Sequence, residues 1–366
     1  MPMTLTEQWS GLCANSEANS VILAFDLGGT KLGYGLFAVT GNAANRSLSD
    51  APLYANAIAT PRGKTAIKDT FIAAVSDAIG QCQKIGYRLL PHAAMGSPGR
   101  FIGENADIIA PGSCVNLGLF PAEFDGLNIS EFLLEALPKS VQLTVKNDAI
   151  AQMAAGLYML QQDPPIAAKL LSQKVCYVGP GTGLGGGFCQ IDTKGSAHYF
   201  SDGHIYDILI ADEDGRPAGA EDLFSGTAFK TRTGKTAFEV NSVPGLLAQY
   251  EPEIVLMGEF LAALIQKITM GDIQKKHPDA NWPEADKRLA SGTRTYVIGG
   301  SMGTKGKMGA LIQKTALETL EKMGISEVQF FSIPDSQFAG LLGAANFLSR
   351  NDLNRAWLSA ETIHTA

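Results

Sequence analysis

Two stretches of this chain share one pattern, in which an apolar strand, a glycine turn and a second strand follow one another. The first is AFDLGGTKLGYGLF at 24–37, and the second is KVCYVGPGTGLGGGFCQID at 174–192. The apolar runs are typical of buried strands, and glycine allows the tight reversal between them. The chain has 366 residues, which exceeds the size at which a single core stops growing. We therefore expect two α/β domains, each beginning with such a hairpin.

Helices are predicted where apolar residues recur at helical spacing. The segment TAIKDTFIAAVSDAIGQCQKIG places Ile67, Phe71, Val75 and Ile79 on one face and ends at Gly86. DAIAQMAAGLYMLQQ is a second predicted helix. TYVIGGSMGTKGKMGALIQKTALETLEKMG has the pattern of a buried strand, a glycine turn and a long helix.

The expected domain boundaries follow from composition and periodicity. Residues 1–20 are polar and aperiodic and are predicted to form a flexible N-terminal arm. A small N-terminal α/β domain is expected over 21–147, completed by a C-terminal helix at about 350–366. A large C-terminal α/β domain is expected over 148–349, because QQDPPIAAKLL interrupts the pattern before the second hairpin.

Composition excludes several classes of partner. The formal net charge of −7 favours neither nucleic acid nor a membrane surface as a partner. No apolar run reaches the ~18 residues that span a bilayer, and the first twenty residues lack the basic and apolar regions of a signal peptide. The five cysteines form no CxxC pair, so we expect reduced thiols and a cytoplasmic location.

The glycine turns allow more than one interpretation. Gly181, Gly183 and Gly186 have GxGxxG spacing, but β-like sequence follows them where a dinucleotide site needs a helix. GTKGKMG at 303–309 lacks the GxxxxGK[ST] register of a P-loop. A strand–turn–strand can be a plain hairpin, or its N–H groups can form an anion nest beside a hydroxyl such as that of Thr30. Two such turns, one in each half, favour phosphate binding.

Five motifs in order resemble those of the ROK sugar kinases, members of the actin/hexokinase/Hsp70 ATPase superfamily. They are FDLGGTK, VKNDA, GPGTGLGGG, VIGGSMG and DSQFAGLLGAANF, spread over residues 21–349. The resemblance implies an α/β fold of two actin-like (ribonuclease H-like) domains with an interdomain cleft. It also implies a kinase that transfers the γ-phosphate of MgATP to a sugar hydroxyl, with the 6-hydroxyl of glucose as the first expectation.

The same resemblance assigns roles to individual residues. Asp148 would be the general base on the sugar hydroxyl, although Asn147 or Asp148 could equally be an ordinary helix N-cap. Asp26 would hold Mg²⁺ through the phosphates, while Lys31 could approach the phosphates or extend into solvent. The implied ATP- and phosphate-binding residues are Asp26, Gly28, Gly29, Thr30, Lys31, Gly181, Thr182, Gly183, Gly299 and Gly300. The implied sugar-binding residues are Asn116, Asn147, Asp148, His204 and Glu221.

The chain departs from the family pattern at two places. Ser201 stands where the family has a glutamate, which removes one expected sugar ligand unless Asp202 replaces it. The stretch 211–221 has no cysteine where many ROK proteins have a zinc motif, so we expect it to bind no zinc. This loop is then expected to be held in place by packing against other parts of the chain. Glu221, at the end of this stretch, could bind sugar hydroxyls or be a helix-start residue favoured by the dipole.

Alternatives to a glucose kinase remain open. The sugar could be an N-acetylhexosamine, mannose or fructose, and a homodimer is compatible with the sequence. A sugar-sensing regulator would need a DNA-binding domain, for which the roughly twenty residues before Val21 are too few. A non-catalytic nucleotide-binding protein is less consistent with the presence of both Asp26 and Asp148. A kinase of this kind is also expected to close its domains on the sugar, which excludes water.

Overall fold

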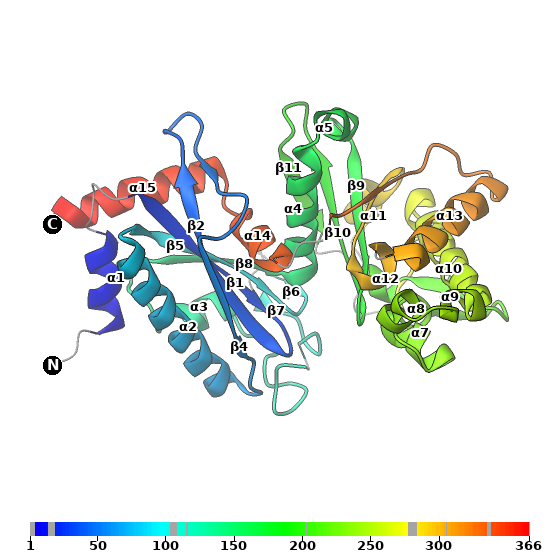
Figure 1. Ribbon diagram of the computed structural model, residues 1–366, viewed down its shortest axis with the longest axis horizontal. Coiled ribbons are helices and arrows are strands. Elements are labelled where there is room, and N and C mark those ends of the chain that lie inside the picture. The colour runs from blue at the N-terminus through cyan, green and yellow to red at the C-terminus, as the bar shows by residue number, and fades with distance from the viewer. Residues whose placement is uncertain are drawn as a thin grey trace. The chain divides into compact units, whose positions relative to one another are not determined.

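The computed structural model describes residues 4–13, 19–102, 108–114, 116–201, 204–276, 284–304, 306–334 and 338–365. The chain divides into two compact units, which are Met1–Ala155 with Ser336–Ala366, and Gly156–Asp335 (Figure 1). The first boundary falls inside helix α4 (Asp148–Gln161). These boundaries differ from the expected ones because the first half of α4 and helix α14 (Ala339–Ala345) pack against the sheet of the first unit.

The first unit is built on one mixed sheet with strand order β3-β2-β1-β5-β8, and β4 also pairs with β2. The hairpin strands β1 and β2 are antiparallel, whereas β5 and β8 run parallel to β1. The strands are β1 (Ser20–Leu27), β2 (Lys31–Thr40), β3 (Ser47–Leu48), β4 (Tyr54–Ala59), β5 (Arg88–Ser97) and β8 (Gln142–Asn147). A separate two-stranded sheet pairs β6 (Phe101–Ile102) with β7 (Ile108–Ile109).

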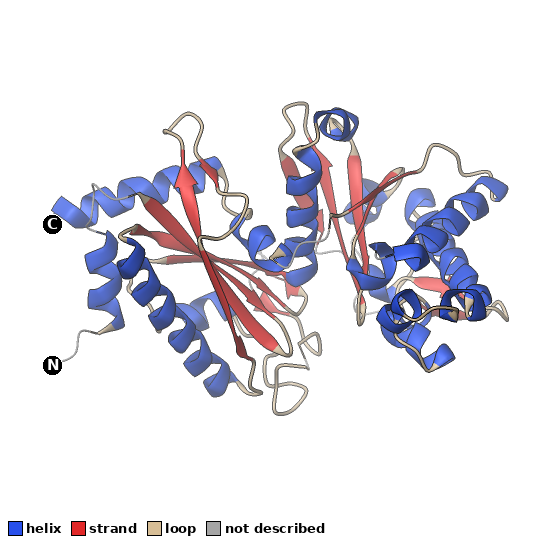
Figure 2. Cartoon of the chain, in the orientation of Figure 1, coloured by secondary structure: helices blue, strands red, loops and turns tan. Residues whose placement is uncertain are grey.

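Helices cover both faces of this first sheet (Figure 2). Successive residues of a strand point to opposite faces. The Tyr34 hydroxyl on β2 donates a 2.8 Å hydrogen bond to Asp77 of α2, while a Cβ at Gly33 would lie 3.8 Å from Leu341 of α14. The helices of this unit are α1 (Leu5–Cys13), α2 (Lys64–Ile85), α3 (Ile129–Leu134), α14 and α15 (Arg350–Thr365), together with the first half of α4.

Helix α1 corrects one expectation. Residues 1–20 are not simply a flexible arm, because Leu5–Cys13 is helical and contacts β5, α2 and α15. Trp9 and Cys13 lie four positions apart, share one face of the helix and have no exposed surface. Two apolar side chains in a polar stretch are too few to produce a visible period, so only the packing identifies this helix.

The second unit repeats the topology of the first. Its sheet has the order β11-β10-β9-β14-β15, with β9 and β10 antiparallel and with β14 and β15 parallel to β9. The predicted two α/β domains of ribonuclease H-like type, each starting with a glycine-turn hairpin, are thereby confirmed. The strands are β9 (Lys174–Pro180), β10 (Leu184–Ile191), β11 (Ala197–Ser201), β14 (Thr295–Ile298) and β15 (Gln329–Ser332).

The helices of the second unit surround this sheet and a core that is rich in leucine, isoleucine and phenylalanine. The long helices α10 (Glu251–Met270) and α13 (Gly306–Lys322) pack against one another. The other elements are α5 (Pro164–Leu170), η1 (Ile205–Asp207), α6 (Ala220–Leu223), α7 (Gly226–Thr233), α8 (Ala237–Ser242), α9 (Leu246–Gln249), α11 (Glu284–Ala290) and α12 (Gly300–Thr304).

The cysteine-free stretch 211–221 is ordered by a small hairpin. Strands β12 (Leu209–Ala211) and β13 (Pro217–Gly219) pair antiparallel, and Ile210 is buried in the core. The Asp212 carboxylate accepts hydrogen bonds from the backbone N–H groups of Asp214 and Arg216 at 2.9 and 2.8 Å, which closes the turn. Within the part of the chain that the structure describes, no group of three His, Cys, Asp or Glu side chains is placed to hold a metal.

Two expectations from composition can be compared with the structure. All five cysteines are buried and none forms a disulfide. Among the described residues, no helix combines the length and the hydropathy that crossing a bilayer requires.

Candidate active site

The first glycine turn joins β1 to β2 and follows Asp26 at the end of β1. The Gly28 N–H donates a 2.9 Å hydrogen bond to the Lys31 carbonyl, which closes the turn. Gly29 and Thr30 are exposed, and among the described residues none accepts a hydrogen bond from their N–H groups. The stretch is therefore a hairpin whose tip offers backbone donors to an anion.

Asp26 and Asp148 are brought together at the carboxyl ends of three parallel strands. Asp26 on β1 is in register with Gly96 on β5, and Gly96 is in register with Lys146 on β8. A Cβ at Gly96 would lie 3.9 Å from Oδ1 of Asp26 and 3.7 Å from Cα of Asp148. The carboxyl ends of parallel strands are where ligands bind in open α/β sheets.

Burial and the neighbouring Asp26 raise the proton affinity of Asp148. Burial, and next the charge of Asp26, raise the pKa of Asp148 to about 6, against the hydrogen bonds from the backbone N–H groups of Ala149 and of Asp148 itself. Burial also raises the pKa of Asp26, while the nearby Lys31 ammonium lowers it. A carboxylate with a pKa near the working pH is suited to accept a proton from a hydroxyl.

Asn147 has a structural role that the cap interpretation predicted. Its Oδ1 accepts a 2.9 Å hydrogen bond from the Ala149 N–H, at the start of α4. Its Nδ2 donates a 2.8 Å hydrogen bond to the Gly99 carbonyl, which fixes the turn after β5. Asp148 Oδ1 also accepts from the Ala149 N–H, at 2.8 Å. Both residues are thus positioned by α4, and direct sugar binding by Asn147 stays a prediction.

The loop that carries Asn116 lies against the first glycine turn. A Cβ at Gly29 would lie 3.1 Å from Nδ2 of Asn116, so the predicted sugar ligand and the predicted phosphate turn are neighbours. Sequence reasoning missed Glu123, whose carboxylate holds this loop. It accepts hydrogen bonds from the backbone N–H groups of Lys64 and Leu119 at 2.9 and 2.5 Å. An isolated glutamate in a loop carries no sequence signal for such a role.

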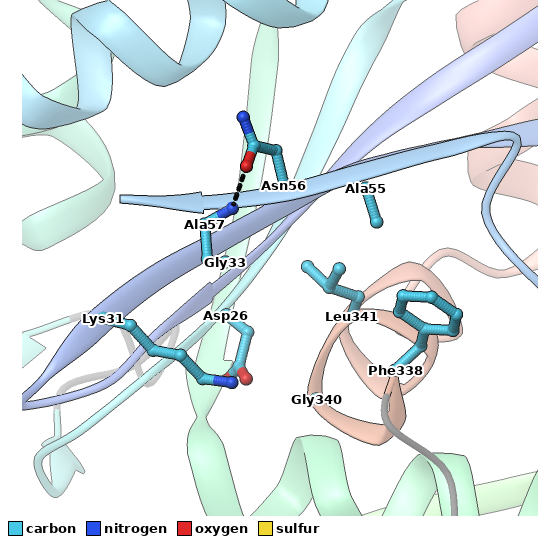
Figure 3. A pocket seen from close by; sticks show the side chains of 9 residues that line it. All are labelled: Asp26, Lys31, Gly33, Ala55, Asn56, Ala57, Phe338, Gly340 and Leu341. Carbon is cyan, nitrogen blue, oxygen red and sulfur yellow. Dashed lines mark hydrogen bonds between the residues drawn. The ribbon is translucent and has the colours of Figure 1, made fainter. Parts of the chain in front are cut away.

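A pocket of about 240 Å³ opens beside Asp26 (Figure 3). The Lys31 side chain extends toward Asp26 in this pocket and is exposed, so its contact with phosphates stays a prediction. Gly340 of α14 contacts the other side of the carboxylate, and a Cβ there would lie 2.1 Å from Oδ2 of Asp26. Sequence reasoning did not single out Gly340. The residues lining the pocket are Asp26, Lys31, Gly33, Ala55, Asn56, Ala57, Phe338, Gly340 and Leu341.

The second glycine turn also joins two antiparallel strands, β9 and β10. The Gly181 N–H donates a 2.9 Å hydrogen bond to the Gly183 carbonyl, and no described residue accepts from the N–H groups of Thr182 or Gly183. Gly299 and Gly300 follow β14 at the same edge of this sheet. Gly300 has φ +69°, and a Cβ there would lie 2.4 Å from the Pro180 carbonyl oxygen, so only glycine fits beside the end of β9.

Two further predicted sugar ligands lie in the second unit. The Glu221 carboxylate accepts a 2.7 Å hydrogen bond from the Leu184 N–H, directly after the turn. His204 is buried, and its ring packs edge-on against Tyr206 with 5.1 Å between the ring centroids. Ser201 ends β11, and Asp202 lies outside the described residues. The interdomain cleft that would join these residues to Asp148 stays a prediction.

Comparison with known proteins finds similar folds but no similar sequence family. No protein-family model matches the chain, and no curated protein sequence matches it. Glucokinase from Balamuthia mandrillaris in complex with glucose is 15% identical, with a TM-score of 0.60 over 92% of this chain and 96% of that one. A ROK family glucokinase from Streptomyces griseus, in complex with glucose and AMPPNP, is 17% identical. Its TM-score is 0.56 over 89% of this chain and 98% of that one.

A regulator has the same fold as these enzymes. A ROK family transcriptional regulator, a homolog of the E. coli MLC protein, is 14% identical, with a TM-score of 0.60 over 95% of this chain and 82% of that one. The chain therefore has the duplicated α/β fold of the actin-like ATPases. More narrowly, it has the fold of ROK-family proteins, which confirms the fold that the resemblance to this family implied. Because kinases and a regulator share this fold, the activity has to be argued from the site.

Proposed function

We propose that the protein is an ATP-dependent sugar kinase in which Asp148 is the general base. The observation that carries this proposal is the Asp148 carboxylate, held at the start of α4 with a pKa raised to about 6 beside Asp26. Asp148 accepts the proton of a sugar hydroxyl as that oxygen bonds to the γ-phosphorus of ATP. The bond from the γ-phosphorus to the bridging oxygen breaks in line, and ADP leaves. Such a transfer depends mainly on positioning and charge neutralisation.

The residues around Asp26 fit a hydrated Mg²⁺. Asp148 lies beside Asp26, and Lys31 is the cation near Asp26, so the two carboxylates carry more negative charge than this lysine offsets. Glycine at 33, 96 and 340 leaves room around Asp26. Asp26 would hold the cation through its water shell, and the cation would neutralise charge on the phosphates. The N–H groups of Gly29, Thr30, Thr182 and Gly183, which have no acceptor among the described residues, would bind phosphate oxygens.

The proposed sugar ligands are Asn116, Asn147, Asp148, His204 and Glu221, with the 6-hydroxyl of glucose as acceptor. Two glucokinases that share the fold were solved with glucose bound. The replacement of the family glutamate by Ser201 keeps N-acetylhexosamine, mannose and fructose as alternative acceptors. The buried, unpaired cysteines are compatible with a reducing cytoplasm.

A coupled assay of ADP release with MgATP, run over a panel of hexoses and N-acetylhexosamines, tests the proposal. At least one sugar should stimulate ADP release. Asp148→Asn should lower kcat by about 100- to 10,000-fold, the usual contribution of a general base, while sugar and AMPPNP binding persist. Retained turnover in this variant would refute the assigned base. If no sugar stimulates ADP release but sugars bind, the second candidate, a sugar-binding regulator that shares the fold, is favoured.

A further inference from the structure

Glu221 supports the second glycine turn from within its own unit. Its Oε2 accepts a 2.7 Å hydrogen bond from the N–H of Leu184, the first residue of β10. A Cβ at Gly183 would lie 2.4 Å from the same oxygen, so the carboxylate lies directly against the turn. The contact joins two segments that are 37 positions apart, whereas a helix-start glutamate would bond to its own helix. Glu221 therefore fixes the turn rather than helix α6.

Helix α7 holds the opposite side of this turn. The Gly226 N–H donates to the Gly181 carbonyl at 2.8 Å, and Thr227 donates to the Thr182 carbonyl through its N–H and its hydroxyl at 3.0 and 2.8 Å. With its carbonyls bonded to α7 and its end bonded to Glu221, the turn leaves the N–H groups of Thr182 and Gly183 without an acceptor in the described part of the chain. These N–H groups are the proposed phosphate donors, so their position depends on Glu221.

The second oxygen of the carboxylate is available to a ligand. Among the described residues, none donates a hydrogen bond to Oε1 of Glu221, and the residue is half-buried. The next residue, Asp222, behaves differently, because it is exposed and forms a 2.8 Å ion pair with Lys276 on the surface. Of these two adjacent carboxylates, Glu221 therefore lies at the candidate site and Asp222 lies on the surface.

We propose that Glu221 couples sugar binding to nucleotide binding. Oε2 fixes the phosphate-binding turn through Leu184, while Oε1 accepts a hydrogen bond from a sugar hydroxyl; this inference rests on the proposed kinase function. A bound sugar restrains the Glu221 carboxylate and thereby the turn. The nucleotide then binds with a smaller loss of conformational entropy, because the turn is already ordered. Linkage requires that the nucleotide tightens sugar binding by the same factor.

The test is isothermal titration calorimetry on the full chain with glucose and magnesium AMPPNP, each titrated alone and in the presence of the other. In the wild type, each ligand should tighten the other by about tenfold, within the usual range of such coupling. Glu221→Ala should weaken AMPPNP binding in the absence of sugar by about fivefold and abolish the coupling. Asp222→Ala is the matched control and should change neither value.

Glu221→Gln keeps an oxygen that can accept from the Leu184 N–H, so it should retain AMPPNP binding without sugar. Amide hydrogen exchange at Leu184 should be slow in the wild type and in Glu221→Gln, and fast in Glu221→Ala. If the wild type binds neither ligand, the proposed function and the coupling both fail. If the wild type is an active kinase but Glu221→Ala binds AMPPNP normally with the coupling intact, the coupling alone is overturned. Fast exchange at Leu184 in the wild type would also overturn it.

Discussion

Gly340→Ala is a sharp test of the site around Asp26. The added Cβ would lie 2.1 Å from Oδ2 and 2.3 Å from Cγ of the Asp26 carboxylate (Figure 3). Ordinary contacts of this kind exceed 3.0 Å, so the carboxylate has to move by about 1 Å. The obstructing atoms belong to a short side chain at the end of β1, so the carboxylate has to shift away from α14 into the adjacent pocket. The substitution therefore displaces the proposed magnesium ligand without altering its chemistry.

A misplacement of about 1 Å in a catalytic group costs on the order of 100-fold in rate, which corresponds to about 2.7 kcal/mol of transition-state stabilisation. We therefore expect kcat/KM for ADP release to fall by about 100-fold in Gly340→Ala. The Mg²⁺ concentration for half-maximal activity should rise as well, because Asp26 is the proposed ligand of the cation. Activity measured over a magnesium titration, with circular dichroism to verify folding, provides both values.

Gly80→Ala is the matched control for this substitution. Gly80 lies inside α2, and a Cβ there meets nothing within 4 Å. Alanine is favoured over glycine in a helix by up to about 1 kcal/mol, so this variant should be slightly more stable and fully active. A folded Gly340→Ala protein with wild-type kcat/KM and wild-type magnesium dependence would refute the proposal that Gly340 is needed to position the Asp26 carboxylate.

Three further predictions concern pH and loop position. With Asp148 as the proposed base and its pKa near 6, log kcat/KM should rise with slope one up to about pH 6 and level off above it; a flat profile from pH 5 to 8 contradicts the assignment. Burial lowers the pKa of His92 below its unfolded value of about 6.5, so the free energy of unfolding should fall as pH drops below 6.5, and less so in His92→Gln, as urea melts would measure. Glu123→Ala should raise the sugar KM by about tenfold with little change in kcat, because the Asn116 loop loses its tether. Equal KM values in Glu123→Ala and in a control at the exposed Glu135 would exclude that role.

Local patterns in the sequence determined the duplicated architecture. Alternating apolar residues, glycine turns and the helical spacing around Phe71 are short-range signals, and they correctly indicated two α/β units with a hairpin at the start of each. The capping position of Asn147 and Asp148 is also a local property, because the cap bonds lie within two residues. Helix α1 was missed because its stability comes from burying Trp9 against elements far away in the sequence.

Only the tertiary structure decided how the site residues are positioned. The strand register places Gly96 between Asp26 and Asp148, and no local pattern encodes that pairing of three strands. The approach of Gly340 to Asp26 and the bond from Leu184 to Glu221 likewise join distant segments. The pKa of Asp148 depends on this arrangement, since burial and a neighbouring charge are properties of the folded chain. The sequence by itself therefore determined which residues could form a phosphate-transfer site, and the packing of the strand ends decided which of them act on one another.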